Sequence, residues 1–558
     1  MKTKGRFKVY YMQKYLKFFS IIGIIIISIL SSTDFAHASP LIPERIRVGL
    51  NYNSLGSDIS ISSNSPVTLN ILDMENKLKS IQAPSKLSIR IDGYYNIINK
   101  EVKNIQYIKA VKYQGDIIGP YHIQIGNSYK DYDSAEKLLK EIRLKIPNSY
   151  LAYDRDWKVW NGLYLDEKQC LEKIKELYNK NQSYTYNLVE PDPKRVQIVD
   201  YNDSSILMIY KNKEIVIKNS DISNNSNILE FNGIKYRGDI VIRTQENGSI
   251  SVINDIMFDE YLYSVVGSEV SPTWHIEALK AQAVAARNYA IINIEKHSKD
   301  GYDLCNTQHC QAYKGYSKEQ ESTNLAVAQT NNILLYYDNK LATTFYHSSS
   351  GGHTENSENI WSEEIPYLRG VEDPFSYGSP NDTWTKELDR KTIEEKLVEN
   401  KIDIGEILDI NIIETSEFGR AKKIEIIGSK SKFILEKEKI RSIFGSTNIK
   451  SIWYEIKTDS DVNVYDMNAN SIDTKKLQNL NIISATGQSL IKPSNNKISI
   501  KGLFEVQQYN IIPETYVLNG KGWGHGLGMS QYGAKGMADM GYNFVEILEY
   551  YYTGTKVK

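Results

Sequence analysis

Glu269 is the residue with the clearest capacity for acid–base chemistry. It lies within the run YLYSVVGSEVSPTWHIEALKAQAVAARNYA, residues 261–290. A carboxyl group can give a proton to a leaving oxygen and later take one back, which is the work of a general acid and base. An acid beside a helix N-terminus also has an ordinary electrostatic role, worth about 0.3–1 kcal/mol. This run alone leaves both interpretations open.

A second group of reactive residues follows in the loop KHSKDGYDLCNTQHCQAY. Two thiolates and two imidazoles complete a tetrahedral zinc set. The sequence therefore predicts a zinc site formed by His297, Cys305, His309 and Cys310. A short disulfide between the two cysteines and free thiols are the alternatives. The third cysteine, Cys170, lies on a predicted helix and is interpreted as a buried core thiol.

Two glycine-rich motifs, ATTFYHSSSGGHTENSENIW and GKGWGHGLGMSQYGAKGMA, offer backbone amides and polar side chains to a ligand. Glycine permits close approach of the backbone, and neither motif has the pattern of a phosphate loop or a serine-hydrolase elbow. Trp361, Tyr367 and Trp384 are candidates for stacking on sugars, although core packing is the commoner role of tryptophan. The residues predicted to bind substrate are Arg287, Tyr289, Ser349, Ser350, Gly351, Gly352, His525, Ser530, Gln531 and Tyr532.

The elements expected to hold Glu269 are a strand and a helix. The apolar residues 261–267 predict a short strand. Thr273 is the predicted N-cap of the helix that follows, with Glu277 in its first turn. Glu269 would then stand at a strand-to-helix joint, fixed at its base and free at its tip. The small and apolar residues that recur at helical spacing are Ile276, Leu279, Ala283, Ala286 and Ala290.

Length and composition limit the class of protein. With 558 residues the chain exceeds the size at which a single core stops growing, so two or more domains are expected. A net charge of -1 argues against a nucleic-acid partner. The 40 tyrosines suit carbohydrate binding, but they agree equally with a general compositional bias.

The N-terminal segment, residues 1–38, predicts export. Basic residues precede an apolar run over 18–30, and Ala36-His37-Ala38 has the form of a cleavage site. The apolar run is shorter than the roughly 20 residues that a spanning helix needs. We expect a cleaved signal peptide, with an uncleaved membrane anchor as the alternative. In both cases the rest of the chain would work outside the cytoplasm.

The remaining pattern predicts an α+β fold. Alternating apolar residues over 39–115 predict short strands. Residues 116–190 predict a small α+β module, with a strand and a helix over 121–146 and a second helix over 166–179. Glycan binding and a plain spacer role are both open for this module.

Residues 191–558 form the third predicted segment, which contains the motifs described above. Within it, helices are expected over 391–401 and 433–445. The stretch 390–512 contains no chemical cluster and is interpreted as scaffold.

Four motifs in one order give the chain a resemblance to a known family. They are VVGSEVSPTWHIEALKAQAVAARNYA, the loop ending HCQAY, FYHSSSGGHTENSENIW and GWGHGLGMSQYGAKGMA. Over residues 196–558 the chain resembles the stage II sporulation protein D and amidase enhancer family. The resemblance implies a strand-rich, multi-lobed catalytic domain with a catalytic helix, which acts on peptidoglycan at the cell surface.

The resemblance also implies the activity of a lytic transglycosylase, which cuts glycan strands stripped of stem peptides and leaves an anhydro sugar end. Members of the family that the chain resembles carry an essential glutamate that matches Glu269. Some bind zinc through residues that match Cys305, His309 and Cys310, whereas His297 has a different spacing. The implied zinc is structural, because many members lack these cysteines, and the implied partner is a cell-wall amidase.

The single strongly placed carboxylate agrees with that activity. A glycoside hydrolase usually needs two carboxylates, whereas a transglycosylase can work with one because the substrate's own hydroxyl attacks. The acid then needs a raised pKa, which Val266, Val270 and Trp274 would favour and a helix N-terminus would oppose. Two other hypotheses stay open: a non-catalytic glycan-binding protein that stimulates an amidase, and a metal-dependent hydrolase.

Overall fold

The computed structural model describes most of the chain as an α+β fold, in agreement with the sequence. The described ranges are 42–50, 58–72, 78–98, 101–105, 114–211, 214–221, 227–245, 249–466, 471–484, 487–490, 496–501 and 505–558. The predicted signal segment, residues 1–38, lies outside them. No helix among the described residues is long and apolar enough to cross a membrane.

A seven-stranded sheet leads into the segment that carries Glu269. Its order is β20-β1-β19-β18-β15-β3-β4. In β15 Ile215 and Ile217 are buried while Glu214 and Val216 are less so, which is the period-two pattern of a strand with one face on the core. The strands are β1 (Arg45–Leu50), β3 (Val67–Leu72), β4 (Leu78–Ala83), β15 (Glu214–Asn219), β18 (Asp239–Thr244), β19 (Ile250–Met257) and β20 (Leu304–Cys305).

A ten-stranded sheet has the order β12-β9-β11-β10-β14-β13-β5-β2-β16-β17. It continues across residue 190, since β10 pairs in parallel with β14 through Leu151 and Met208. The strands are β2 (Ile59–Ser62), β5 (Lys86–Ile91), β9 (Tyr121–Tyr129), β10 (Ser149–Asp154), β11 (Asp156–Tyr164), β12 (Tyr186–Val189), β13 (Val196–Asp200), β14 (Ile206–Lys211), β16 (Ile228–Phe231) and β17 (Ile234–Arg237).

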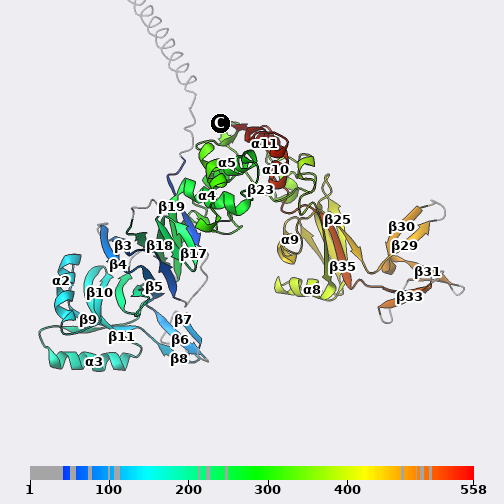
Figure 1. Cartoon of the computed structure of the whole chain (residues 1–558). Helices are drawn as coiled ribbons and strands as arrows, with labels where there is room; N and C mark the ends of the chain where they lie inside the picture. Colours follow the sequence, from blue (N-terminus) through cyan, green and yellow to red (C-terminus); the bar gives the residue numbers. More distant parts are fainter. Residues whose placement is uncertain are drawn as a thin grey trace, which may run out of the picture. The chain divides into compact units, whose positions relative to one another are not determined.

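Two helices pack against β9 to β12, as Figure 1 shows. They are α2 (Tyr132–Arg143) and α3 (Glu167–Lys180), close to the predicted positions. An aspartate caps each one: Asp131 accepts from the Ser134 amide, and Asp166 accepts from the Gln169 amide. Cys170 on α3 is fully buried and free, which confirms it as a core thiol.

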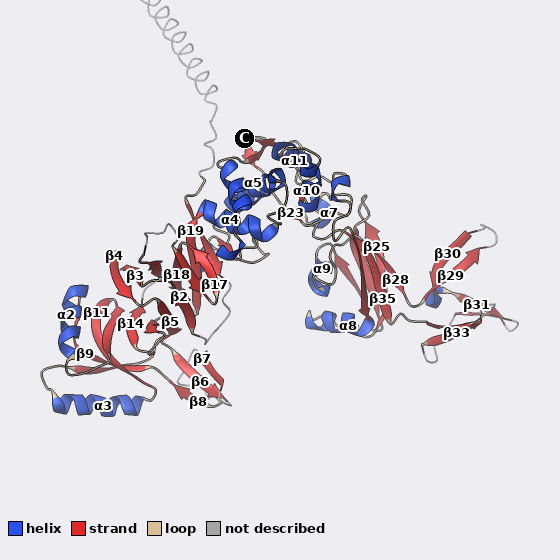
Figure 2. Ribbon diagram, in the orientation of Figure 1, coloured by secondary structure: helices blue, strands red, loops and turns tan. Residues whose placement is uncertain are grey.

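A cluster of helices holds the first motif (Figure 2). It contains α4 (Phe258–Glu269), α5 (Ile276–Ile292), α6 (Glu321–Gln329), α10 (Gln531–Asp539) and α11 (Phe544–Tyr551). The helix predicted to begin after Glu269 is confirmed as α5. The buried side chains of the cluster include Ala281, Val284, Met537 and Leu548, which form one core.

The strand predicted over 261–267 is wrong, because these residues belong to helix α4. Phe258, Leu262 and Val265 are buried and recur at three- and four-residue steps, which is the spacing of a helix face. The β-branched pair Val265-Val266 favoured a strand locally, but burial against neighbouring helices decides the outcome. The predicted N-cap is also wrong, since His275 and not Thr273 precedes α5 and accepts from the Glu277 amide.

Residues 383–458, together with residues 515–521, form two three-stranded sheets and two short helices. The sheets are β24-β35-β28 and β25-β26-β27. The helix predicted over 391–401 is confirmed as α8 (Arg390–Glu399). The one predicted over 433–445 is wrong in its first half, where β27 (Lys432–Glu436) precedes α9 (Lys439–Phe444). The other strands are β24 (Thr383–Asp389), β25 (Ile407–Thr415), β26 (Ala421–Gly428), β28 (Tyr454–Thr458) and β35 (Thr515–Lys521).

Candidate active site and metal-binding loop

Glu269 is the last residue of α4, and two groups that are far apart in the sequence hold its carboxylate. The backbone amide of Ala312 donates to Oε1 at 3.0 Å. The side chain of Gln531, at the start of α10, donates to Oε2 at 3.5 Å. The carboxyl group is therefore oriented by the loop 304–312 and by the second glycine-rich motif.

Burial raises the pKa of Glu269 above its ordinary value, and the hydrogen bonds from Ala312 and Gln531 and the charge of Lys314 oppose that rise. The position of Glu269 in α4 adds to the raising effect, because the carbonyl groups at a helix C-terminus disfavour a nearby negative charge. The opposing helix N-terminus that the sequence suggested is separated from it by the turn 270–275. The carboxyl group thus has the environment of a general acid.

Glu269 lines a cavity of about 650 Å³. Among the described residues that form its wall, Glu269 is the only carboxylate. Aromatic side chains on the wall include Tyr346, Trp361 and Trp523. The size, the aromatic surface and the few polar groups are typical of a ligand site.

The two glycine-rich motifs lie side by side at this cavity. Strand β23 (Tyr346–His347) pairs in parallel with β36 (Met529–Ser530). Ser349 and Trp523 exchange two backbone hydrogen bonds, of 3.1 and 2.8 Å. Gly524 has φ +118°, and a Cβ there would lie 2.6 Å from the Cβ of His347, so this turn requires glycine.

Two histidines from these motifs, His347 and His525, line the cavity with ring centroids 5.5 Å apart. Burial, together with the charges of Arg441 and Arg420, lowers the pKa of His525 to about 3. Burial and the neighbouring His525 hold the pKa of His347 well below its ordinary value. Both imidazoles are therefore neutral near pH 7 and act as hydrogen-bonding groups.

The four predicted metal ligands converge. The ligand atoms of His297, Cys305, His309 and Cys310 all lie within 4.8 Å of one another. Sγ of Cys305 is 3.6 Å from Nδ1 of His309, and Sγ of Cys310 is 3.5 Å from Nε2 of His297. Tetrahedral zinc with ordinary bond lengths separates sulfur and nitrogen ligands by about 3.6 Å. The donor set and its spacing therefore fit a zinc ion.

Three of the predicted substrate-binding residues line the cavity, namely Tyr289, His525 and Gln531. Arg287 does not, because it is fully buried and its guanidinium donates to the carbonyls of Val327 and Ile333. It fastens α5 to the end of α6. Of the predicted stacking residues, Trp361 lines the cavity, whereas Tyr367 and Trp384 pack in cores.

The remaining predicted binding residues support the loops and do not form the wall. Ser350 is fully buried and donates to Asp373, while Ser349 is paired with Ser379. Gly351 and Gly352 adopt positive φ beside them, and Gly352 borders a different hollow. Ser530 caps α10 and Tyr532 packs on Trp274. A serine-rich turn satisfies its own backbone as readily as a ligand, and the sequence cannot separate the two.

Gln311, Lys314 and Arg441 are among the residues of the site that the sequence did not predict. Gln311 is buried and its side chain bonds Tyr261, Ala286 and Tyr346, which fixes the loop that carries Ala312. Lys314 and Arg441 line the cavity. Arg441 lies on α9, within the stretch 390–512 that was interpreted as scaffold, so that interpretation is wrong for this helix. No local motif marked it.

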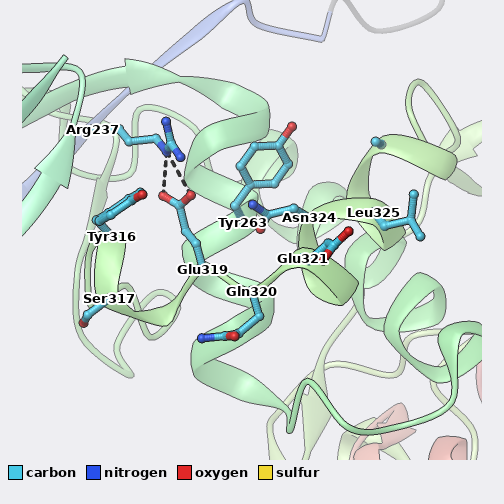
Figure 3. A pocket seen from close by; sticks show the side chains of 10 residues that line it. Arg237, Tyr263, Tyr316, Ser317, Glu319, Gln320, Glu321, Asn324 and Leu325 are labelled. Atoms are coloured by element: carbon cyan, nitrogen blue, oxygen red, sulfur yellow. Dashed lines mark hydrogen bonds and ion pairs between the residues drawn. The ribbon is translucent and has the colours of Figure 1, made fainter. Parts of the chain in front are cut away.

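A second hollow, of about 760 Å³, lies between β17, α4 and α6 and shares no residue with the cavity of Glu269. Figure 3 shows Arg237 facing Glu319, with two hydrogen bonds of 2.9 and 2.8 Å. Tyr263 and Leu325 form part of its wall. The ion pair joins β17 of the ten-stranded sheet to the segment just before α6, which gives Arg237 and Glu319 a structural role.

Two family models match parts of the chain. A family model described as stage II sporulation protein matches residues 246–337, which include Glu269 and all four metal-ligand candidates. A second model, described as a domain of unknown function, matches residues 381–472, which include Arg441.

Three relatives extend the match. The chain is 27% identical over 410 residues to an uncharacterised protein of Brachyspira hyodysenteriae, covering 71% of this chain and 95% of the relative. It is 31% identical to the amidase enhancer of Bacillus subtilis, covering 53% of this chain but only 40% of that protein. It is 28% identical to stage II sporulation protein D of the same organism, covering 55% and 75%. Residues 246–337 thus form a domain of the stage II sporulation protein family, and the chain is similar to proteins named amidase enhancer and stage II sporulation protein D.

Proposed function

We propose that this protein is a peptidoglycan lytic transglycosylase that cleaves glycan strands, with Glu269 as its general acid and base. The observation that carries the proposal is that Glu269 is the only carboxylate among the described residues of the cavity wall, in a setting that raises its pKa. A hydrolase would need a second carboxylate across the cleft. The predicted N-terminal signal segment supports action outside the cytoplasm. The proposed substrates are strands stripped of stem peptides.

The chemistry requires one acid. The protonated carboxyl of Glu269 gives its proton to the glycosidic oxygen as the bond from that oxygen to the anomeric carbon breaks. The 6-hydroxyl of the same sugar then bonds to the anomeric carbon, and its proton passes to the Glu269 carboxylate. This step restores the acid and leaves a 1,6-anhydro end, so no water is consumed.

The amide of Ala312 and the side chain of Gln531 would hold the carboxylate while it is charged. The aromatic rings of Tyr346, Trp361 and Trp523 offer faces for sugar rings. Neutral His347 and His525 would bond to hydroxyl or acetamido groups. These roles need fixed side chains, and the pairing of β23 with β36 fixes Tyr346 and His347.

A structural zinc ion is part of the proposal. His297, Cys305, His309 and Cys310 would hold it, and four protein ligands leave no position for a reactive water. The donor set thus favours a cross-link of the loop 304–312 over a metal-dependent hydrolase. Elemental analysis should find about one zinc per chain, and Cys305→Ser should lower it; zinc content unchanged by that substitution would contradict the assignment.

The decisive experiment uses glycan strands freed of stem peptides. Wild-type protein should yield products with 1,6-anhydro ends by mass spectrometry, and Glu269→Gln should lose about 10²–10⁴-fold in rate. Glu321→Gln, which removes an exposed carboxylate outside the cavity, is the matched control and should cleave normally. Equal cleavage by wild type and Glu269→Gln would refute the proposal.

A second candidate function rests on one relative that is named an amidase enhancer. In that case the cavity binds glycan and the protein stimulates a cell-wall amidase without cutting the strand. Stimulation of an amidase that survives Glu269→Gln, with no anhydro product from wild type, would favour this function.

A further inference from the structure

The cavity of Glu269 carries more positive than negative charge. Three cationic side chains, Lys296, Lys314 and Arg441, share its wall with one carboxylate. Within the described ranges, neither Lys296 nor Lys314 forms an ion pair, although Lys296 donates to the carbonyl of His309. A concave site lined by one sign of charge attracts ligands of the other sign.

Arg441 is the cation that the structure holds most firmly. Its side chain is only 11% exposed. Nε donates to the carbonyl of Ile449 at 3.1 Å, and Nη1 pairs with Glu438 at 2.9 Å. These bonds fix the guanidinium plane, so binding an anion at its remaining edge would cost little side-chain entropy. The fork of an arginine matches the two oxygens of a carboxylate.

Lys314 lines the same cavity as Glu269. Its charge acts against the burial that raises the pKa of Glu269. Lys314 is exposed and comes from the loop after the metal-ligand candidates, whereas Arg441 comes from α9. The two cations thus reach the cavity from different segments of the chain.

We propose that this cavity selects saccharides that carry free carboxylate groups, with Lys314 and Arg441 as the residues that bind them. The proposal rests on the proposed function, since it takes the ligand to be a glycan strand. Each stem peptide that is removed by amide hydrolysis leaves a carboxylate on its sugar, while a sugar that keeps its peptide has an amide there. The segment that matches a domain of unknown function would then contribute to substrate selection through Arg441.

The test measures binding with the full chain carrying Glu269→Gln, so that turnover does not interfere. The probes are carboxylate-bearing strands freed of peptide, the same strands with each carboxylate converted to a methylamide, neutral chitin oligosaccharides and a glycerol phosphate polymer. We expect the carboxylate strands to bind at least about tenfold more tightly than the methylamide strands, with a preference that weakens as salt rises.

In the Glu269→Gln background, a further Arg441→Gln or Lys314→Gln substitution should remove most of the preference for carboxylate strands. A further Arg441→Lys substitution should keep part of it. Lys439→Gln on the same helix and Lys318→Gln near Lys314 are the matched controls; neither residue lines the cavity, and both variants should keep the preference. Lys314→Gln keeps the test decisive if Arg441→Gln fails to fold.

Equal affinity for carboxylate and methylamide strands would overturn the proposal, as would tighter binding of the phosphate polymer. Either result leaves the proposed function standing if wild type still produces anhydro ends. Conversely, a clear carboxylate preference without any cleavage by wild type would refute the transglycosylase and keep the selection by Lys314 and Arg441.

Discussion

Replacing Gly533 by alanine should destabilise the protein, although the same change in an exposed helix stabilises by about 1 kcal/mol. Gly533 lies in α10, shortly after Ser530, which caps the helix, and Gln531, which donates to Glu269. A Cβ at this position would lie 2.5 and 2.7 Å from the two oxygens of Asp373 and closer still to the hydroxyl of Tyr551. Both neighbours are fully buried, so neither can move aside easily.

The cost follows from the bonds that the clash would break. The Tyr551 hydroxyl donates to Asp373 at 2.7 Å, and Ser350 donates to the other oxygen at 2.6 Å. Overpacking costs about 1–3 kcal/mol, and a lost hydrogen bond to a charged group costs about 1.5–3 kcal/mol. After the gain in helix propensity, Gly533→Ala should cost about 2–5 kcal/mol.

A double-mutant cycle isolates the cause. Tyr551→Phe removes the nearest atom and should cost about 1.5–3 kcal/mol alone. Because the phenyl ring leaves room for the new methyl group, the double variant should be more stable than additivity predicts, by about 1–2 kcal/mol. Urea unfolding followed by tryptophan fluorescence gives the three values. Stabilisation by Gly533→Ala, or additive costs, would refute the reasoning.

Three further outcomes are expected. Activity should fall as pH rises through the raised pKa of Glu269, and a pH profile with no loss on the alkaline side would contradict an acid role. The raised pKa also means that the charged carboxylate destabilises the folded state at pH values above the ordinary pKa of 4.5. Glu269→Gln should therefore raise the thermal midpoint of unfolding at neutral pH, and this gain should vanish in acid. A midpoint that is unchanged at every pH would argue against a buried charge. Asp92→Ala should cost about 3–5 kcal/mol in unfolding experiments, because Asp92 is fully buried and neutralises buried Arg195 at 2.7 Å; a loss below about 1 kcal/mol would show that the pair is not isolated from water.

The sequence by itself pointed to the proposed acid and to the metal-ligand candidates. Residue type and spacing within one loop selected the set His297, Cys305, His309 and Cys310. Glu269 was selected by the order of four motifs, because its own run leaves a plain electrostatic role open. Helix α5 was equally predictable, because its apolar positions follow the helical period over 17 residues. Acid–base and metal-binding capacity are properties of the side-chain types, so the sequence alone indicates them.

Only the tertiary structure decided how the site is assembled. Strand and helix compete closely in a run such as 261–267, and packing of Leu262 and Val265 against other helices selects the helix. The same packing puts Glu269 at a helix C-terminus, which reverses the electrostatic effect expected from the sequence. Ser350 was expected to face a ligand, yet it became a buried support for Asp373, because its neighbours leave it no access to the cavity.

Arg441 shows most clearly what sequence patterns cannot predict. It lies 172 positions after Glu269 in the sequence, outside every motif, and only the fold brings it to the same cavity wall. A contact between residues so far apart depends on how sheets and helices pack, and no local periodicity records it. The proposed acid could therefore be found from the sequence, whereas the cations beside it could be assigned to the site only from the three-dimensional structure.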